Sequence, residues 1–156
     1  MESSGGKGRL TLARGDSRFD GSKTLVDTSV WSLAFRRDGE QAAPEVAALR
    51  AALVGADDVF TTGLIVQELL QGFAGPKARH QLVERLVSIA FLQPDREDHI
   101  EAAEVRNACR RRGVQIGTID ALLIQLCRRH DLTLLSTDRD FVTAAKHVAF
   151  RLWAPR

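Results

Sequence analysis

The chain has 156 residues, of which 27% are charged and 44% hydrophobic, with a formal net charge of +2. This length suits one domain with a sizeable core, and the composition is that of an ordinary soluble globular protein. No apolar run approaches the roughly 18 residues of a membrane span, and the N-terminus lacks the apolar segment of a secretory signal. We therefore expect a cytoplasmic protein that makes no membrane contact.

The first 23 residues are rich in Gly, Ser and Arg and have no sustained periodicity. This composition predicts a flexible N-terminal extension over residues 1–23. The folded domain is then expected to span residues 24–156, because no second linker and no internal repeat follow.

Short apolar runs alternate with helical patterns in this domain. The predicted strands are 24–26, 57–62, 90–93, 133–136 and 148–153. The predicted helices are 28–37, 44–54, 63–73, 80–89, 95–111, 118–130 and 141–146. The helix over 118–130 is the clearest, because its apolar residues follow the helical repeat. The alternation of strands and helices predicts an α/β fold with a parallel sheet covered on both faces.

Acidic residues stand at the ends of these predicted elements. Asp27 and Asp138 directly follow or closely follow apolar strands, and Asp120 opens the helix over 118–130. Glu68 lies in an otherwise apolar helix. Ligands of parallel α/β sheets bind beyond the carboxyl ends of the strands, so we expect these acids to face one crevice.

Any one of the aspartates taken alone is better explained as a helix cap than as a metal ligand, and Glu68 alone could simply be a solvent-facing side chain. Their convergence favours another interpretation, because carboxylates packed together repel and raise one another's pKa values. A hard divalent cation removes this conflict, and an oxygen-only ligand set suits Mg²⁺ or Mn²⁺.

Four segments carry a resemblance to a known family: VDTSVW (26–31), VQELLQG (66–72), GTIDALLIQLC (117–127) and LLSTDRDF (134–141). In order and in spacing they resemble the signature segments of PIN-domain ribonucleases, above all the VapC toxins of bacterial toxin–antitoxin (VapBC) pairs. The resemblance covers residues 24–153. It implies a PIN-like three-layer α/β/α fold with a central, mainly parallel sheet.

The resemblance also implies a function, namely Mg²⁺- or Mn²⁺-dependent endonucleolytic cleavage of RNA by the toxin of a toxin–antitoxin pair. The implied catalytic and metal-binding acids are Asp27, Glu68, Asp120 and Asp138. Asp140 is the second acid of the last segment and is expected to reach the metal through water. Hydroxyl groups expected to support the site belong to Thr28, Ser29 and Thr118. Ser136 occupies a position that Thr or His often fills.

The implied partners are an RNA substrate, a VapB-like antitoxin and a second copy of the chain in a homodimer. Arg36 and Arg37 follow the helix that leaves Asp27, so they are the best candidates for contact with RNA phosphates. The two cysteines and four histidines show no metal-ligand spacing, which disfavours a zinc site and a histidine-based ribonuclease.

Two alternatives remain at this point. Residues 138–142 also fit the DxDx[TV] pattern of phosphatases in which the first aspartate is a covalent nucleophile, although that motif normally opens its domain. The second alternative is a non-catalytic PIN-like module that binds RNA or protein. The presence of an acid at all four positions disfavours it.

Overall fold

The computed structural model describes residues 23–36, 43–55 and 58–155. Its five strands form one sheet in the order β3-β2-β1-β4-β5, and every neighbouring pair is parallel. The strands are β1 (Lys23–Val26), β2 (Asp58–Thr62), β3 (Ala90–Leu92), β4 (Thr133–Leu135) and β5 (Arg151–Leu152). The predicted parallel sheet is confirmed. The extension predicted for residues 1–23 lies, except for Lys23, outside the described residues.

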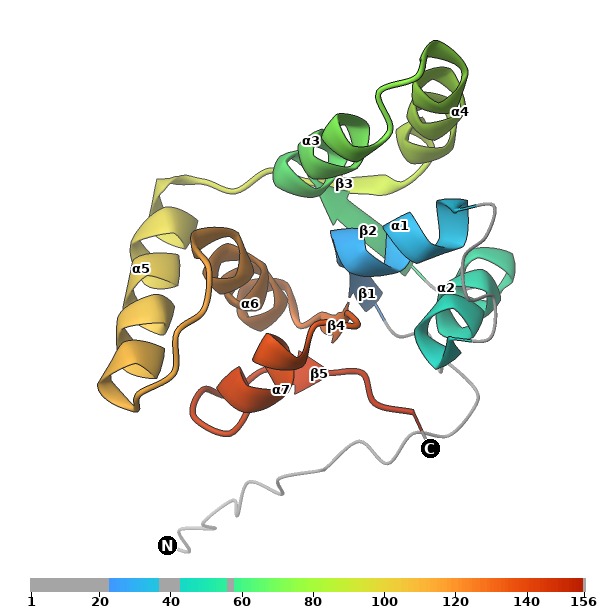
Figure 1. Cartoon of the computed structure of the whole chain (residues 1–156). Helices are drawn as coiled ribbons and strands as arrows, with labels where there is room; N and C mark the ends of the chain where they lie inside the picture. The colour runs from blue at the N-terminus through green and yellow to red at the C-terminus, as the bar shows by residue number, and fades with distance from the viewer. Residues whose placement is uncertain (1–22, 37–42, 56–57, 156) are drawn as a thin grey trace, which may run out of the picture.

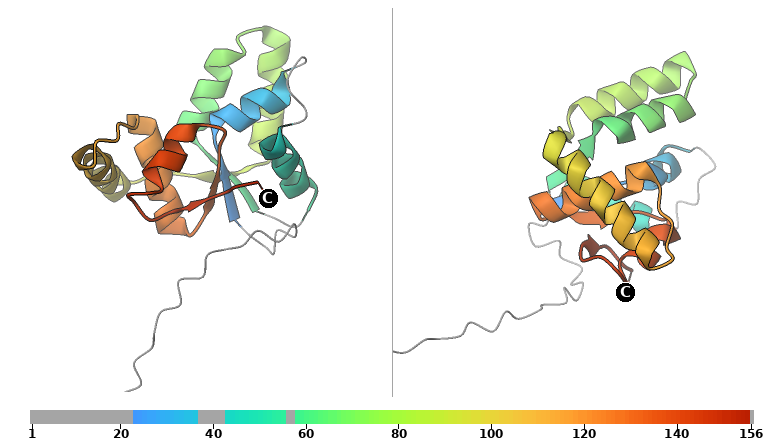
Figure 2. Two further views of the ribbon diagram at one scale, coloured as in Figure 1. Left: turned by 60° about the horizontal axis from the view of Figure 1, so that its bottom comes forward. Right: turned by 90° about the vertical axis from the view of Figure 1, so that its left-hand side faces the viewer.

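Seven helices connect and cover the strands in the described ranges (Figure 1). They are α1 (Thr28–Phe35), α2 (Pro44–Val54), α3 (Gly63–Gly72), α4 (Pro76–Val87), α5 (Arg96–Arg111), α6 (Thr118–His130) and α7 (Arg139–Ala144). Helices α5 and α6 lie on one side of the strands and α1 and α2 on the other, whereas α3 and α4 form a pair at the top of Figure 1 (Figure 2). None of these helices is long and apolar enough to cross a membrane.

The core forms where α6 packs between α5 and the sheet. Strand residues such as Leu25, Val26 and Leu134 are completely buried, as expected for strands of a parallel sheet with both faces covered. In α6 every residue from Ala121 to Cys127 is buried. The predicted one-sided apolar pattern therefore understates the burial of this helix, since its middle, from Ala121 to Cys127, has protein on all sides.

Several predicted boundaries differ from the structure, most of all those of α4, α7 and β5. Helix α4 begins at Pro76 rather than at residue 80, because proline is well suited to the first helical position, and it ends at Val87. Helix α7 begins at Arg139 rather than at residue 141, because Asp138 caps it. The last strand is limited to Arg151–Leu152, although Val148, Phe150 and Trp153 still pack against the core.

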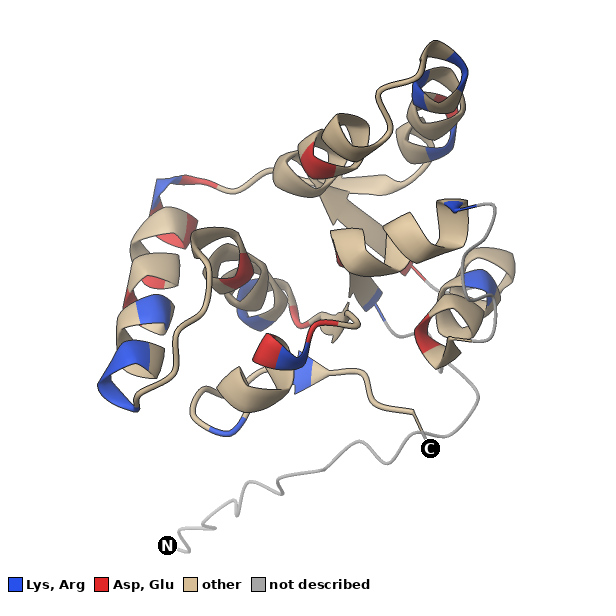
Figure 3. Cartoon of the chain, in the orientation of Figure 1, with Lys and Arg blue, Asp and Glu red and all other residues tan. Residues whose placement is uncertain are grey.

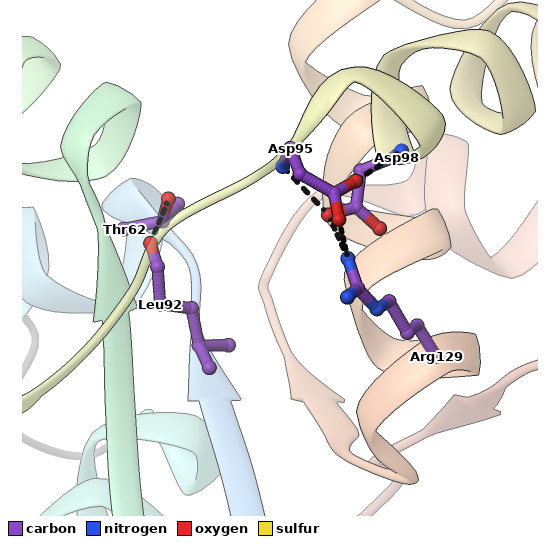
Figure 4. Close-up of polar contacts among 5 residues, drawn as sticks. All are labelled: Thr62, Leu92, Asp95, Asp98 and Arg129. Atoms are coloured by element: carbon purple, nitrogen blue, oxygen red, sulfur yellow. Dashed lines mark hydrogen bonds and ion pairs between the residues drawn. The ribbon is translucent and has the colours of Figure 1, made fainter.

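An ion-pair network joins the start of α5 to the end of α6 (Figure 4). Asp95 and Asp98 form a capping box, in which the backbone N–H of each donates to the carboxylate of the other at 2.9 and 3.0 Å. The guanidinium of Arg129 contacts both carboxylates. Asp98 is fully buried, so its charge depends on this one cation and on the capping N–H group.

We predict that Arg129→Ala lowers the free energy of unfolding clearly more than Arg128→Ala does, because it leaves the buried Asp98 charge without its cation. Arg128→Ala is the matched control, since Arg128 is exposed and has no ion-pair partner among the described residues. Urea denaturation of both variants measures the difference. Equal stability of the two variants would show that the network contributes nothing.

Candidate metal centre and active site

Asp27 is positioned by the pairing of β1 with β4. Val26 lies opposite Leu135 in the parallel register, and the backbone N–H of Asp27 continues the ladder by donating to the carbonyl of Leu135 at 2.9 Å. Asp27 therefore leaves the carboxyl end of β1 beside Ser136, which leaves the same end of β4. The Asp27 side chain is only 8% exposed.

Two hydroxyl groups fix one carboxylate oxygen of Asp27. Ser29 Oγ and Ser136 Oγ donate to Asp27 Oδ2 at 2.9 and 2.8 Å. Each hydroxyl is held in turn, because the backbone N–H of Thr137 donates to Ser29 Oγ and that of Asp138 donates to Ser136 Oγ, at 3.1 and 3.0 Å. The carboxylate is thus oriented with Oδ1 free of any hydrogen bond from the described residues.

Ser136 is the site residue that the sequence pattern did not single out for a role. A signal was present, because Ser136 directly follows a strand expected to lie in the same parallel sheet as β1. Only the pairing of β1 with β4 shows that its hydroxyl faces Asp27, 109 positions earlier in the chain.

Three further carboxylates converge near this point. One oxygen from each of Asp120, Asp138 and Asp140 lies within 4.8 Å of the other two. Asp120 comes from the first turn of α6, and the other two come from the start of α7. Figure 3 shows these acidic positions at the starts of α6 and α7.

Both helix starts use their acids as caps as well. Asp120 Oδ2 accepts from the backbone N–H of Gly117 at 3.3 Å, and Asp138 Oδ1 accepts from that of Asp140 at 2.9 Å. A Cβ at residue 117 would lie 3.3 Å from Asp120 Oδ2, so a glycine makes room for this approach. Capping is therefore real for two of the acids, but it leaves the other oxygen of each carboxylate available.

Glu68 approaches from α3 and is half-buried. Thr28 Oγ1 donates to Glu68 Oε1 at 3.4 Å. Burial, followed by the charge of Asp27, raises the pKa of Glu68, and the hydrogen bond from Thr28 opposes this rise. Asp27 therefore lies close enough to Glu68 for their charges to repel.

Among these acids, Asp120 has the most strongly raised pKa. Its pKa is raised to about 6, because burial of the carboxyl and the charges of Asp27, Asp138 and Asp140 together outweigh the hydrogen bond from the N–H of Gly117, which lowers it. Asp27 is thus electrostatically coupled to Asp120 on one side and to Glu68 on the other.

The donor set fits a hard divalent cation. The group of Asp120, Asp138 and Asp140 offers only carboxylate oxygens, which are the ligands that Mg²⁺ and Mn²⁺ prefer. A cation would also relieve the carboxylate repulsion that, together with the larger effect of burial, raises the pKa of Asp120. Within the described chain, Asp27 and Glu68 do not belong to this group of three acids. The charge of Asp27 nevertheless raises the pKa of both Asp120 and Glu68.

The remaining predicted residues are placed differently. Thr28 and Ser29 contact Glu68 and Asp27, as described above. Thr118 is exposed and lines a cavity between α3, α5 and α6. Arg36 is exposed at the end of α1, whereas Arg37 lies outside the described residues.

Comparisons with known proteins agree with this geometry. A model of the PIN domain family matches residues 24–147. The VapC ribonuclease Mb1587 of Mycobacterium bovis is 33% identical over 125 residues, which cover 78% of this chain and 91% of that protein.

Two solved structures share the fold. The crystal structure of VapBC2 from Rickettsia felis, bound to a DNA fragment from its promoter, has a TM-score of 0.65 at 15% identity and covers 84% of this chain and 97% of that one. Mycobacterium tuberculosis VapC20, a sarcin-ricin loop cleaving toxin, has a TM-score of 0.62 at 19% identity and covers 80% of this chain and 96% of that one.

The parallel sheet, the acids at its carboxyl edge and the family match define one class of protein, and the chain belongs to the PIN domain family. Its similarity to a VapC ribonuclease extends over most of both chains. The relationship to PIN-domain and VapC proteins predicted from the four segments is confirmed.

We predict that metal-free Asp120→Asn protein is more stable than the wild type at pH 7, because the substitution removes a partly buried charge that neighbouring carboxylates repel. The gain should be about 1 kcal/mol, since solvent screens the repulsion at a half-exposed group. The folded-state pKa of Asp120 lies above its ordinary value of 3.8. The folded state therefore binds the proton more tightly, and the stability contributed by this group falls as the pH rises from about 4 to about 6.

Denaturation in chelator at pH 4 and pH 7 measures both proteins. The advantage of the asparagine variant should be small at pH 4 and complete above pH 6. An advantage that does not change across this window would show that Asp120 does not titrate there.

Proposed function

We propose that the protein is an endoribonuclease that cleaves RNA phosphodiester bonds with Mg²⁺ or Mn²⁺, and that it acts as the toxin of a toxin–antitoxin pair. The observation that carries the proposal is the convergence of Asp120, Asp138 and Asp140 next to the buried Asp27. The similarity to a VapC ribonuclease supports RNA as the substrate.

In this proposal the residues of the chain place charge rather than transfer protons. Asp120, Asp138 and Asp140 hold the ion, and Asp140 contacts it directly or through water. Ser29 and Ser136 orient the carboxylate of Asp27 towards the ion site. Glu68 adds a carboxylate on the side of the site formed by α3. A divalent ion bound here supplies a water of lowered pKa and neutralises charge that develops on the phosphate.

The phosphatase alternative loses its support. It required Asp138 as a covalent nucleophile, but Asp138 caps α7 and belongs to a group of three acids in a PIN domain. A non-catalytic PIN-like binding module is a remaining outcome of the experiments below.

The partners we propose are RNA, a VapB-like antitoxin and a second copy of the chain. The Rickettsia felis neighbour is a VapBC assembly, which supports an antitoxin as a partner for a toxin of this fold. Arg36 is exposed at the end of the helix that starts beside Asp27, which suits it to contact RNA phosphates. We propose that Arg37 and this arginine act together.

We predict that Mg²⁺ or Mn²⁺ raises the melting temperature, because a cation that binds only the folded state relieves repulsion among the acids. The gain is about 2.7 kcal/mol at a concentration one hundredfold above Kd. Thermal melts with and without chelator measure it, and calorimetry gives the affinity. The shift should disappear in Asp120→Asn. A melting temperature that stays constant through millimolar metal, with no heat of binding, would argue against the ion site.

We predict that purified protein cuts total RNA with Mg²⁺ but not with chelator, and that Asp27→Asn reduces cleavage by about 100-fold or more while the fold survives. The substitution keeps the shape and removes the charge. The control is Asp58→Asn, which changes an exposed aspartate at the opposite end of the sheet, where Asp58 pairs with Lys23.

Circular dichroism and mapped RNA ends report on the fold and the reaction. A well-folded Asp27→Asn protein that cleaves like the wild type would refute the proposed site. RNA binding without cleavage under any divalent metal would instead identify the non-catalytic module.

A further inference from the structure

A cavity of about 280 Å³ lies between α3, α5 and α6. Its walls are mostly apolar and come from Leu64, Ala102, Ala103, Ala121 and Leu122. The cavity adjoins the acids through two elements. Ala121 directly follows Asp120 in α6, and Leu64 precedes Glu68 by about one turn of α3. The cavity therefore lies beside the acids on both helices.

We propose that this cavity binds one unpaired nucleobase of the RNA, next to the phosphodiester that is cut. The proposal rests on the proposed ribonuclease activity and adds a determinant of which sites are cleaved. Such a cavity is at the small end of ligand sites, so it admits a flat ring rather than a helix of a partner protein.

The polar groups of the cavity suit the edge of a base. His99, Arg106, Asn107 and Thr118 supply them, and the lining contains no carboxylate. Arg106 Nε donates to the carbonyl of Ile116 at 2.9 Å, which fixes the guanidinium plane. The terminal nitrogens of Arg106 have no hydrogen-bond partner in the described ranges, so they are donors for a carbonyl or ring nitrogen of a base. Apolar walls below such donors favour a ring that stacks and bonds at one edge.

The face of α5 that lines the cavity carries positive charge towards the end of the helix. Ala103, Arg106, Asn107 and Arg110 follow helical spacing, so they lie along one face of the helix. Arg110 is exposed, with further arginines beside it at the end of α5 (Figure 3). A base in the cavity would therefore have its neighbouring phosphates close to a cation, which is the arrangement that single-stranded RNA requires. This charge favours RNA over an apolar protein segment as the occupant.

The test fills the cavity from its exposed side. Ala103 is exposed on α5, so Ala103→Phe blocks the cavity without entering the core. Ala51→Phe makes the same change at an exposed position of α2, away from the cavity, and is the matched control. Asn107→Ala is a second variant that removes polar groups from the rim, in case the phenylalanine disturbs folding.

Two measurements use the full chain. Cut ends in total RNA, mapped with Mg²⁺, give the base preference beside the cut. Fluorescence anisotropy of a short labelled single-stranded RNA, measured in chelator, gives the affinity without cleavage. We expect Ala103→Phe to weaken binding by about tenfold and to flatten the preference at one nucleotide. Asn107→Ala should change both in the same direction, and Ala51→Phe should match the wild type.

Unchanged cut sites and affinity in both cavity variants would overturn the base site and leave the ribonuclease proposal standing. A change in oligomeric state alone, seen by light scattering, would overturn it in favour of a protein interface. If the wild type cuts no RNA, the proposed function fails, and the anisotropy then decides the cavity separately. Loss of affinity in Ala103→Phe supports base binding, and equal affinity refutes it.

Discussion

Repulsion between carboxylates at one edge of the sheet is the constraint around which the rest of the protein is arranged. Four aspartates and a glutamate approach one another there, and the charges of neighbouring carboxylates add to burial in raising the pKa values of Asp120 and Glu68. The fold opposes this repulsion with local donors. Hydroxyls bond Asp27, and backbone N–H groups bond Asp120 and Asp138. Each donor stabilises a carboxylate in place without neutralising its charge, and so the site retains its attraction for a cation.

Helix α6 is held in place at the end opposite to the acidic site. Helix α6 carries Asp120 in its first turn and Arg129 in its last. The first turn lies in the crowded site, whereas the last is tied to the buried Asp98 of α5. Buried residues from Ala121 to Cys127 fill most of the length between them. The start of α6, where carboxylates repel one another, is thus held in position by the packing of the helix and by the ion pair at its other end.

Much of this architecture was predictable because it depends on local patterns. Helix α2 was predicted at both ends, since Pro44 and Gly55 mark its limits, and α6 was predicted from its apolar repeat. The order of strands and helices indicated a parallel sheet, and a parallel sheet brings strand ends such as those before Asp27 and Asp138 to one edge.

What could not be predicted depends on contacts between distant segments. The pairing of Arg129 with Asp98 requires the packing angle of α5 on α6, which no spacing in the sequence encodes. Helix α4 was predicted to begin at residue 80, whereas it begins at Pro76, because proline is compatible both with the segment after a helix and with the first position of the next one. The roles of Ser136 and of the cavity beside Thr118 likewise appear only when separate elements are assembled.

The pairing of β1 with β4 has a consequence for the order in which the protein becomes competent during synthesis. Asp27 leaves the ribosome before the strand β4 that orients it, and the serine that bonds it comes 109 positions later. The acids of α7 emerge later still. A nascent chain that stops short of β4 therefore holds Asp27 without its neighbours, and the charged centre cannot assemble. For the toxin proposed above, this order keeps the metal site incomplete until β4 and α7 have been translated.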